Sequence, residues 1–221
     1  MKYRAIAIDG PAGSGKSTVA KIIAKELGFT YIDTGAMYRA ITLKALNLDI
    51  KDLGDEANYD FINSTTLDFI DSKMTMDGID VSKEIRTEEI VKHVSLVSSL
   101  KYVRDALVSA QREMAKKTNV VMDGRDIGTN VLVDADLKIF LTATVDVRAE
   151  RRYLEQIQKG ISNMTFEEVK ADLIRRDTYD STRKHNPLRK AIDAIELDTS
   201  GLTIEEVVNK ITHLFKELKH E

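Results

Sequence analysis

A short stretch near the start of the chain has the residue types and spacing that bind an oligophosphate. It reads Gly10-Pro11-Ala12-Gly13-Ser14-Gly15-Lys16-Ser17 and matches the pattern G-x-x-x-x-G-K-S/T. Its glycines let successive backbone N–H groups point at phosphate oxygens, and a helix beginning here adds its positive end. We expect Lys16 to reach the outer phosphates of a nucleoside triphosphate and Ser17 to ligate Mg²⁺. The residues predicted to bind the triphosphate are Gly10, Pro11, Ala12, Gly13, Ser14, Gly15, Lys16, Ser17 and Thr18.

The segments on either side of this loop have the pattern of an α/β fold. The apolar run 5–8 predicts a strand before the loop, and apolar residues at helical spacing predict a helix after it, ending at about Leu27 before Gly28. A second short strand, 29–32, leads into Asp33-Thr34-Gly35-Ala36-Met37-Tyr38-Arg39. Ligands of open α/β sheets bind beyond the carboxyl ends of the strands. Thr34, Tyr38 and Arg39 are therefore candidate binding residues.

A third predicted strand also ends in polar residues. The apolar run 120–122 is followed by Asp123-Gly124-Arg125-Asp126-Ile127-Gly128. Phosphate-loop enzymes often place a magnesium carboxylate at the end of such a strand, so Asp123 is a second metal candidate beside Ser17. Arg125 and Asp126 follow at the same edge of the predicted sheet, which places two carboxylates and an arginine beside the phosphate loop.

The rest of the chain predicts one domain, 1–221, with a central parallel sheet flanked by helices and a small antiparallel insert. Residues 46–64 are polar with helical tendency, and alternating apolar residues from Leu67 to Val81 predict three short strands with turns at Asp71-Ser72 and Asp77-Gly78. Thr87 is positioned to cap a following helix. Further strands are predicted at 137–141 and 194–198, and capping boxes start helices at Thr165 and Thr203.

Arginines concentrate in the segment 148–189. One predicted helix carries Arg148, Arg151 and Arg152, and the helix started by Thr165 carries Arg176, Asp180 and Arg183 at spacings of four and three. At these spacings the last three residues would share one helix face. We interpret 148–189 as a lid that closes over the triphosphate and excludes water, with Arg152 as a catalytic phosphate clamp.

Composition excludes several classes of protein and site. The chain has 221 residues, a net charge of -3 and no cysteine, so it has neither disulfides nor a thiolate nucleophile or metal site. The net charge argues against a general nucleic-acid binder. No apolar run approaches the ~18 residues of a membrane span, and the start of the chain does not resemble a signal peptide. We expect a cytoplasmic protein that binds no nucleic acid and no membrane.

The arginines suit one chemical task above others. Transfer between two phosphates needs little covalent help, because the main obstacle is bringing two anions together in line. Guanidinium groups stay charged and grip phosphate oxygens in pairs. A monophosphate acceptor is already mostly dianionic at neutral pH, so it requires no general base. A hydroxyl acceptor would require one, and Asp33 could then serve.

Taken in order, these motifs resemble those of the bacterial cytidylate kinases. The resemblance rests on the phosphate loop, Asp33-Thr34-Gly35-Ala36-Met37-Tyr38-Arg39, Glu84-Ile85-Arg86-Thr87, Asp123-Gly124-Arg125-Asp126-Ile127-Gly128 and the segment 176–183, and it covers nearly the whole chain. It implies transfer of the γ-phosphate of ATP to CMP or dCMP with Mg²⁺. It also implies the fold of a P-loop nucleoside-monophosphate kinase, with a CMP-binding insert within 60–100 and a mobile helical lid. That family often has serine where this chain has Thr34, which keeps the hydroxyl.

The same resemblance assigns roles to individual residues. It implies that Lys16 and Arg125 act in catalysis and that CMP is bound by Thr34, Tyr38, Arg39, Ser95, Arg104, Arg125, Asp126, Arg176, Asp180 and Arg183. Within that set Arg39 and Arg125 would hold the acceptor phosphate. Chemistry agrees for the base, since a carboxylate such as Asp126 accepts from the cytosine amino group and an arginine such as Arg104 donates to its O2 and N3.

Other interpretations remain open on the sequence alone. A nucleotide-gated switch or motor would also use a phosphate loop, although the chain lacks an Asn-Lys-x-Asp guanine reader. Kinases acting on UMP or on shikimate-like hydroxyls would share much of the pattern. We expect the chain to use ATP and CMP or dCMP as a monomer.

Overall fold

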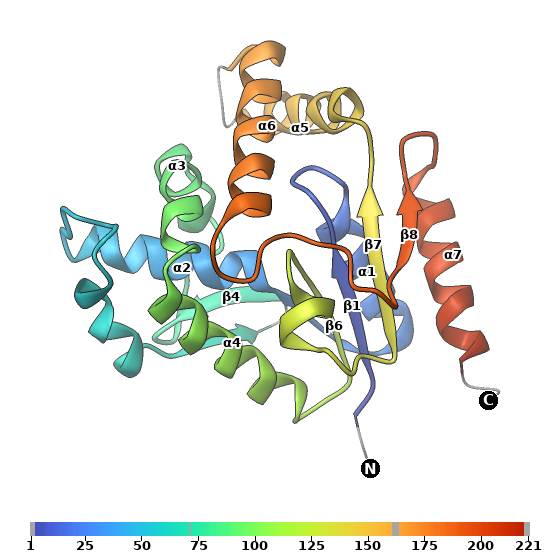
Figure 1. Cartoon of the computed structure of the whole chain (residues 1–221), viewed down its shortest axis with the longest axis horizontal. Helices are drawn as coiled ribbons and strands as arrows, with labels where there is room; N and C mark the ends of the chain where they lie inside the picture. Colours follow the sequence, from blue (N-terminus) through green and yellow to red (C-terminus); the bar gives the residue numbers. More distant parts are fainter. Residues whose placement is uncertain (1–2, 71, 161–163, 219–221) are drawn as a thin grey trace.

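The computed structural model of the chain describes residues 3–70, 72–160 and 164–218 (Figure 1). Its centre is a parallel sheet in the order β2-β6-β1-β7-β8. The strands are β1 (Ala5–Asp9), β2 (Thr30–Asp33), β6 (Val120–Gly124), β7 (Leu137–Thr142) and β8 (Ile195–Asp198). Because all five run the same way, their carboxyl ends meet at one edge.

Helices cover both faces of this sheet because side chains alternate along each strand. Ile6 and Ile8 face a core shared with α1 (Lys16–Leu27) and α7 (Ile204–Glu217). Ala7 faces the opposite core, shared with α2 (Thr34–Asn47) and α4 (Lys101–Ala115). Every strand of the central trio β6, β1 and β7 is almost fully buried, so the sheet is a rigid base for the residues that follow its strands.

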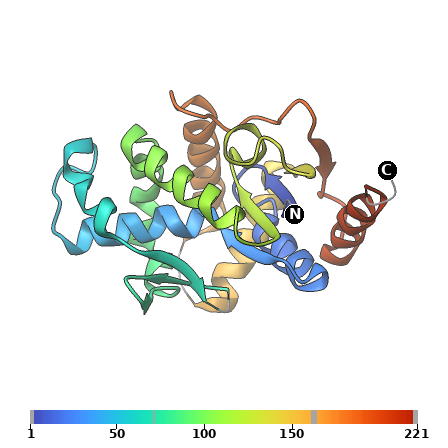
Figure 2. The same cartoon turned by 90° about the horizontal axis from the view of Figure 1, so that it is seen from below.

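The predicted insert is a separate antiparallel sheet. It consists of β3 (Leu67–Ile70), β4 (Lys73–Met76) and β5 (Ile79–Asp80), in that order. Asp77 and Gly78 form the predicted turn between β4 and β5, with φ of 52° and 81°. The other predicted turn, Asp71-Ser72, falls partly outside the described residues. The short helices η1 (Glu56–Ser64) and η2 (Glu84–Arg86) flank this sheet, which lies against α2 (Figure 2).

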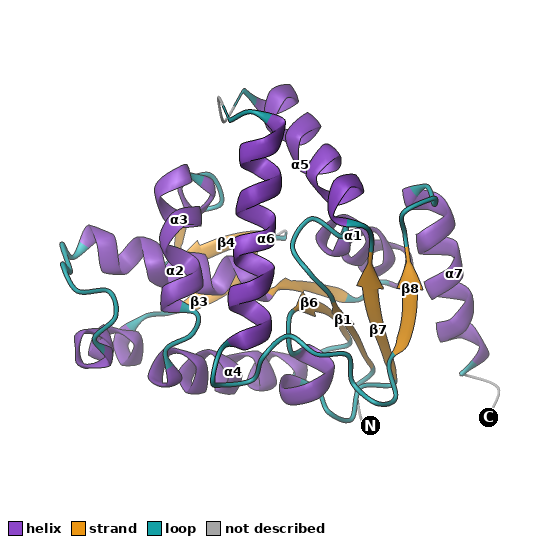
Figure 3. Ribbon diagram, turned by 45° about the horizontal axis from the view of Figure 1, so that its top comes forward, coloured by secondary structure: helices purple, strands orange, loops and turns teal. Residues whose placement is uncertain are grey.

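Two long helices, α5 (Val145–Lys159) and α6 (Phe166–Thr182), make up most of the predicted lid segment 148–189. They pack on each other, and α6 also contacts α3 (Glu88–Val97) of the insert region (Figure 3). The predicted capping boxes at Thr165 and Thr203 are both present. Residues 161–163 of the segment lie outside the described part of the chain. That the segment moves stays a prediction.

Three local expectations differ from the structure. The helical tendency of 46–64 is interrupted, because α2 ends at Asn47 and only 56–64 forms a further, 3-10 helix. Thr87 is the N-cap residue of α3, but its hydroxyl donates to the Glu84 carbonyl at 3.2 Å and does not cap the helix. Helix α6 ends at Thr182, so Arg183, at φ -58° and ψ 145°, lies just beyond the helix face predicted for it. Among the described residues, no helix is long and apolar enough to cross a bilayer.

Candidate active site

The loop between β1 and α1 has a backbone that requires glycine. Gly10 has φ 150°, and a Cβ there would lie 2.0 Å from the Leu141 carbonyl oxygen of the neighbouring strand β7. Gly15, the N-cap residue of α1, has φ 88°. The loop is thus turned tightly onto the amino end of α1, where its amides and the helix dipole favour an anion.

Two residues of the lid helices hold the top of this loop. Arg148 of α5 donates to the Ala12 carbonyl oxygen at 2.8 Å and also pairs with Asp177 of α6. The Asp177 carboxylate accepts from the Ala12 backbone N–H at 3.0 Å. Both polar groups of Ala12 are therefore bound by the segment 148–189, which ties the helices α5 and α6 to the phosphate loop.

Lys16 lies within the loop and is only 5% exposed. Its Nζ donates to the Pro11 carbonyl oxygen at 2.6 Å and to the Ser14 hydroxyl at 3.3 Å. Burial lowers the pKa of Lys16 to about 7, and the charge of Arg125 acts in the same direction. An anion held in the loop would raise this pKa again by favouring the ammonium form.

The two metal candidates meet in the structure. The Ser17 hydroxyl donates to Asp123 Oδ2 at 2.8 Å, and the Tyr31 hydroxyl donates to Oδ1 at 2.9 Å. Burial raises the pKa of Asp123 to about 6, and the charge of Asp33 adds to the rise. Mg²⁺ prefers oxygen ligands and is usually held by one or two protein groups beside substrate phosphates. A hydroxyl and a carboxylate at the base of the loop fit that preference, although the described residues contain no cluster of three or more His, Cys, Asp or Glu suited to a metal.

The residues after β2 are held by one another. Asp33 caps α2 by accepting from the Ala36 N–H at 2.8 Å, and it also pairs with Arg39 at 3.1 Å. The Thr34 hydroxyl donates to the Asp123 carbonyl oxygen at 2.7 Å, joining β2 to β6. Arg39 keeps a buried Nε that has no partner among the described residues. The Asp33 carboxylate is therefore committed to structure, whereas Arg39 retains a free donor.

Arg125 and Arg176 bring two further cations to the same edge of the sheet. Arg125 Nε donates to Asp180 Oδ2 at 2.8 Å. Arg176, one turn before Asp180 on α6, has no hydrogen bond or ion pair within the described chain, and its Nε is buried. Burial lowers the pKa of Arg176 to about 10, and the charge of Arg125 contributes in the same direction. The charges of Asp172 and Asp180 act on Arg176 in the opposite direction, so its lowered pKa follows mainly from burial.

A buried group of charges surrounds Asp126. Arg104 of α4, only 1% exposed, donates to Asp126 Oδ2 at 2.5 Å and to the Ser98 carbonyl oxygen at 3.1 Å. Arg183 donates to Asp126 Oδ1 at 3.1 Å. The Arg104 guanidinium also lies 5.6 Å from the centroid of the Tyr38 ring. The structure thus brings Tyr38, Arg104, Asp126 and Arg183 together, and their roles in binding CMP stay a prediction.

Three other predicted residues lie in different surroundings. Ser95 is buried on α3, where its carbonyl oxygen accepts from the Ser98 hydroxyl at 3.1 Å. Arg152 pairs with Glu155 at 3.0 Å and lines a cavity of about 230 Å³ together with Arg176, between the insert and the lid helices. Thr18 is exposed in the first turn of α1. None of the three has a hydrogen bond to Lys16 or Asp126 within the described chain.

Sequence reasoning missed a carboxylate at the centre of the site. Asp9 is 4% exposed at the end of β1 and accepts from the backbone N–H groups of Ile127 and Gly128 at 2.8 and 2.7 Å. Burial raises its pKa to about 6. Asp9 therefore fixes the loop that carries Arg125 and Asp126. The sequence does contain a signal for Asp9, because this residue ends a predicted strand immediately before Gly10. Asp33 and Asp123 are candidates on the ground of the same placement at the end of a strand.

The lowered pKa of Lys16 predicts proton uptake when ATP binds. Since the pKa is about 7 in the free protein and rises beside phosphate, ATP binding at about pH 7.5 should take up protons, and affinity should fall as the pH increases above 7. Titration calorimetry with Mg²⁺-free ATP in buffers of different ionisation enthalpy measures the uptake. Lys16→Arg, which keeps a permanent charge, is the control. If Lys16→Arg and the wild-type protein take up equal numbers of protons, the protons bind to the neighbouring carboxylates instead of Lys16.

Solved structures share the fold of this chain. A shikimate kinase from Bacteroides thetaiotaomicron covers 96% of this chain and 98% of its own at a TM-score of 0.50 and 15% identity. An uncharacterized protein from Eubacterium ventriosum covers 98% and 99% at a TM-score of 0.53 and 15% identity. At such low identity these likenesses concern the fold alone. They agree with the parallel sheet and phosphate loop of a P-loop kinase.

Sequence comparison is more specific. The chain is 54% identical to a cytidylate kinase from Lactobacillus johnsonii, with 96% of this chain and 94% of that protein covered. It is 51% identical to a cytidylate kinase from Alkaliphilus oremlandii over 98% of this chain and 99% of that one. The family model described as cytidylate kinase matches residues 6–217. With the phosphate loop, the arginines and the Asp126 cluster at one edge of its sheet, the chain belongs to the cytidylate kinase family.

Proposed function

We propose that this protein transfers the γ-phosphoryl group of ATP to CMP or dCMP, giving ADP and CDP or dCDP. The observation that carries the proposal is a group of desolvated cations at the sheet edge, one of which, Arg176, has a buried Nε without a partner in the described chain. The charge of Arg125 lowers the pKa of both Lys16 and Arg176, and Arg176 has no hydrogen bond or ion pair within the described chain. Two phosphate-bearing ligands would supply the negative charge. Membership of the cytidylate kinase family supports CMP as the acceptor.

On the donor side, the phosphate loop would bind ATP. Its amides and the amino end of α1 attract the β- and γ-phosphates, and Lys16 would turn from the Pro11 carbonyl towards them. Ser17 and Asp123 would hold Mg²⁺, which when bound neutralises charge on the phosphates. The attachment of Ala12 to Arg148 and Asp177 keeps the loop in shape while ligands exchange.

On the acceptor side, Arg39, Arg125 and Arg176 would grip the monophosphate of CMP. Arg39 and Arg176 each keep a buried, unpartnered Nε, which is costly unless a ligand accepts from it. A phosphate acceptor needs no general base, and Asp33 is already engaged by Ala36 and Arg39. The arrangement therefore supports a phosphate acceptor over the hydroxyl acceptor for which Asp33 was considered.

The Asp126 cluster would read the cytosine. A carboxylate accepts about four hydrogen bonds, and three positions on Asp126 are taken by Arg104, Arg183 and Asn130. The remaining position, on Oδ1, suits one N–H of the cytosine amino group. Arg104 has a buried Nε without a partner in the described chain, which suits O2 or N3 of the same base. Uracil presents O4 in place of the amino group and would leave Asp126 facing a lone pair.

Several finer assignments belong to the same proposal. Residues 60–100 would form the CMP-binding insert with Ser95, and 148–189 would close as a lid from which Arg152 reaches a phosphate. The pairing of Arg152 with Glu155 would then have to break on closure. We expect the enzyme to act as a monomer. We place the enzyme in the cytoplasm, acting on small nucleotides without nucleic-acid or membrane partners.

The proposal predicts that purified protein makes CDP from CMP, ATP and Mg²⁺. An assay coupled to ADP release, run across nucleoside monophosphates, measures the acceptor range. ATP alone should be hydrolysed barely at all, since transfer requires the acceptor phosphate in line. Rapid ATP hydrolysis that CMP does not stimulate would indicate a nucleotide-gated switch or motor instead.

Asp126 should determine the preference for CMP over UMP. We expect kcat/KM for CMP to exceed that for UMP by about ten- to a hundredfold, roughly the cost of one buried unpaired polar group. Asp126→Ala should reduce this ratio by about tenfold or more, as steady-state kinetics with both acceptors would show. An unchanged ratio in a folded Asp126→Ala enzyme would contradict the base assignment.

Arg176 should contribute more to the use of CMP than its exposed neighbour Arg175. Arg176→Ala should lower kcat/KM for CMP by about a hundredfold or more, because a charged donor to phosphate is lost from a buried position. Arg175→Ala, which loses only an exposed pair with Asp172, is the matched control and should be near wild type. Arg152→Ala tests the lid assignment separately: if kcat and the KM for ATP both stay near wild type, Arg152 is no phosphate clamp.

A further inference from the structure

Asn130 makes a contact that neither the motifs nor the family comparison assigns. It lies on the short π-helical turn η3 (Ile127–Val131) that follows the Asp126 loop. Its side-chain Nδ2 donates to Asp126 Oδ2 at 3.0 Å, the same oxygen that receives Arg104 at 2.5 Å. The Asn130 backbone N–H also donates to the Asp126 carbonyl oxygen at 3.0 Å. One residue thus binds both the main chain and the carboxylate of Asp126.

The chemistry of the neighbours decides which way the Asn130 amide faces. Asp126 is paired with the guanidinium groups of both Arg104 and Arg183, and a carboxylate can only accept hydrogen bonds. The amide must therefore present its NH₂ group, since its oxygen would meet Asp126 Oδ2 with two lone pairs. Asn130 accordingly acts as a neutral donor, which orients the carboxylate without adding a charge.

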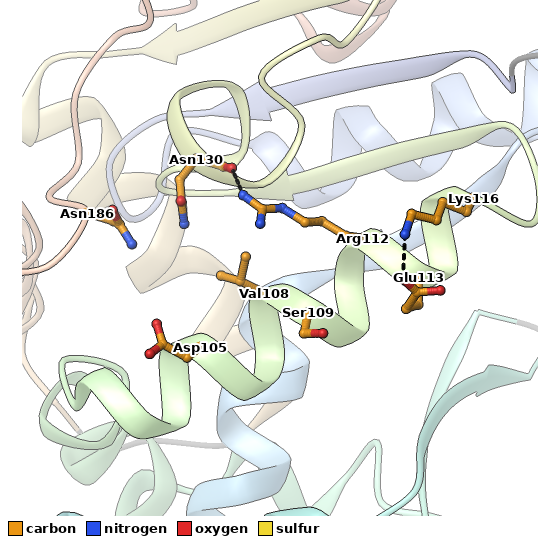
Figure 4. A pocket seen from close by; sticks show the side chains of 8 residues that line it. All are labelled: Asp105, Val108, Ser109, Arg112, Glu113, Lys116, Asn130 and Asn186. Carbon is orange, nitrogen blue, oxygen red and sulfur yellow. Dashed lines mark hydrogen bonds and ion pairs between the residues drawn. The ribbon is translucent and has the colours of Figure 1, made fainter.

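The backbone of Asn130 is itself held in place by α4. Arg112 donates to the Asn130 carbonyl oxygen at 2.6 Å and to that of Val131 at 3.2 Å (Figure 4). Arg104 is on the same helix, two turns earlier. Helix α4 therefore positions both donors to Asp126 Oδ2. It carries Arg104 itself, and it holds Asn130 through Arg112. Asn130 also lines a polar cavity of about 430 Å³ between α4 and η3, so its outer side is free of core packing.

We propose that Asn130 is a positioning residue for acceptor-base selection, holding Asp126 so that its remaining lone pair on Oδ1 points at the cytosine amino group. This inference rests on the proposed function, in which Asp126 reads the base. Arg104 and Arg183 each hold one oxygen of the carboxylate, which limits its rotation about the Cβ–Cγ bond but gives Oδ2 only one donor. A second donor on the same oxygen fixes the plane of the carboxylate, and Arg183 on Oδ1 then limits which direction is left for a ligand.

Two substitutions of similar size separate positioning from packing. Asn130→Leu removes the donor, and Asn130→Asp replaces it with an anion beside Asp126 Oδ2. We expect kcat/KM for CMP to fall roughly three- to tenfold in Asn130→Leu, mainly through KM, and further in Asn130→Asp. The kcat/KM for UMP should stay unchanged or rise, because a less restrained Asp126 carboxylate can rotate away from O4 of uracil. The control is Thr129→Ala, an exposed neighbour on the same turn, which should keep the wild-type CMP-to-UMP ratio.

Thermal unfolding of each variant shows whether stability alone explains the kinetics. A ratio that falls in both Asn130 variants while the unfolding midpoint and kcat stay near wild type supports the positioning role. If both variants keep the wild-type ratio while Asp126→Ala loses it, the role of Asn130 is overturned and the proposed function stands. If Asp126→Ala also keeps the ratio, the base assignment fails and the positioning role fails with it.

Discussion

Desolvation of the cations at one edge of the sheet is the constraint on which the rest of the site depends. Lys16, Arg125 and Arg176 converge at the carboxyl edge of a parallel sheet, and the pKa values of Lys16 and Arg176 are lowered by burial and by the charge of Arg125. Such an arrangement is stable only because a packed fold over-determines it. A site whose cations are already desolvated is suited to two phosphates, because each anion offsets a cost already present in the folded state.

Carboxylates hold these cations and loops in position. Asp180 orients Arg125, Asp177 ties Arg148 to the phosphate loop, and Asp33 both caps α2 and pairs with Arg39. The acidic groups are thus mostly committed to guanidinium or backbone donors. A chain with a net charge of -3 can therefore gather lysine and arginine side chains at one edge of its sheet, because its carboxylates hold them there.

Asp9 and Asp126 show how closely the donor and acceptor sides are linked. Asp9 ends the strand that precedes the phosphate loop, yet it binds the backbone of Ile127 and Gly128, which follow Asp126. The phosphate loop and the loop that carries Asp126 are therefore attached to each other through the buried side chain of Asp9. Their relative position is set by neighbouring strands of the sheet, since β1 and β6 pair directly.

Much of the fold could be predicted because its signals are local. The glycine and lysine spacing of the phosphate loop, the capping boxes at Thr165 and Thr203 and the alternation of the insert depend on residues only a few positions apart. The family resemblance supplied roles for Arg104 and Asp126 that spacing alone does not contain. Local signals were less informative over 46–64, where helical tendency is interrupted and Asp49 adopts a left-handed φ of 56°.

The sequence by itself determined which strands end in chemically active residues, because a phosphate loop and polar strand ends are short motifs whose backbone needs are local. Only the tertiary structure decided which arginines are bound to other groups of the protein and which keep donors available for a ligand. Arg148 and Arg176 look alike in the sequence, but Arg148 binds Ala12 and Asp177, whereas Arg176 has no such partner within the described chain. The physical reason is that a guanidinium group takes its role from the acceptors it meets, and these come from other segments of the chain, 29 residues away for Asp177 and 136 for Ala12.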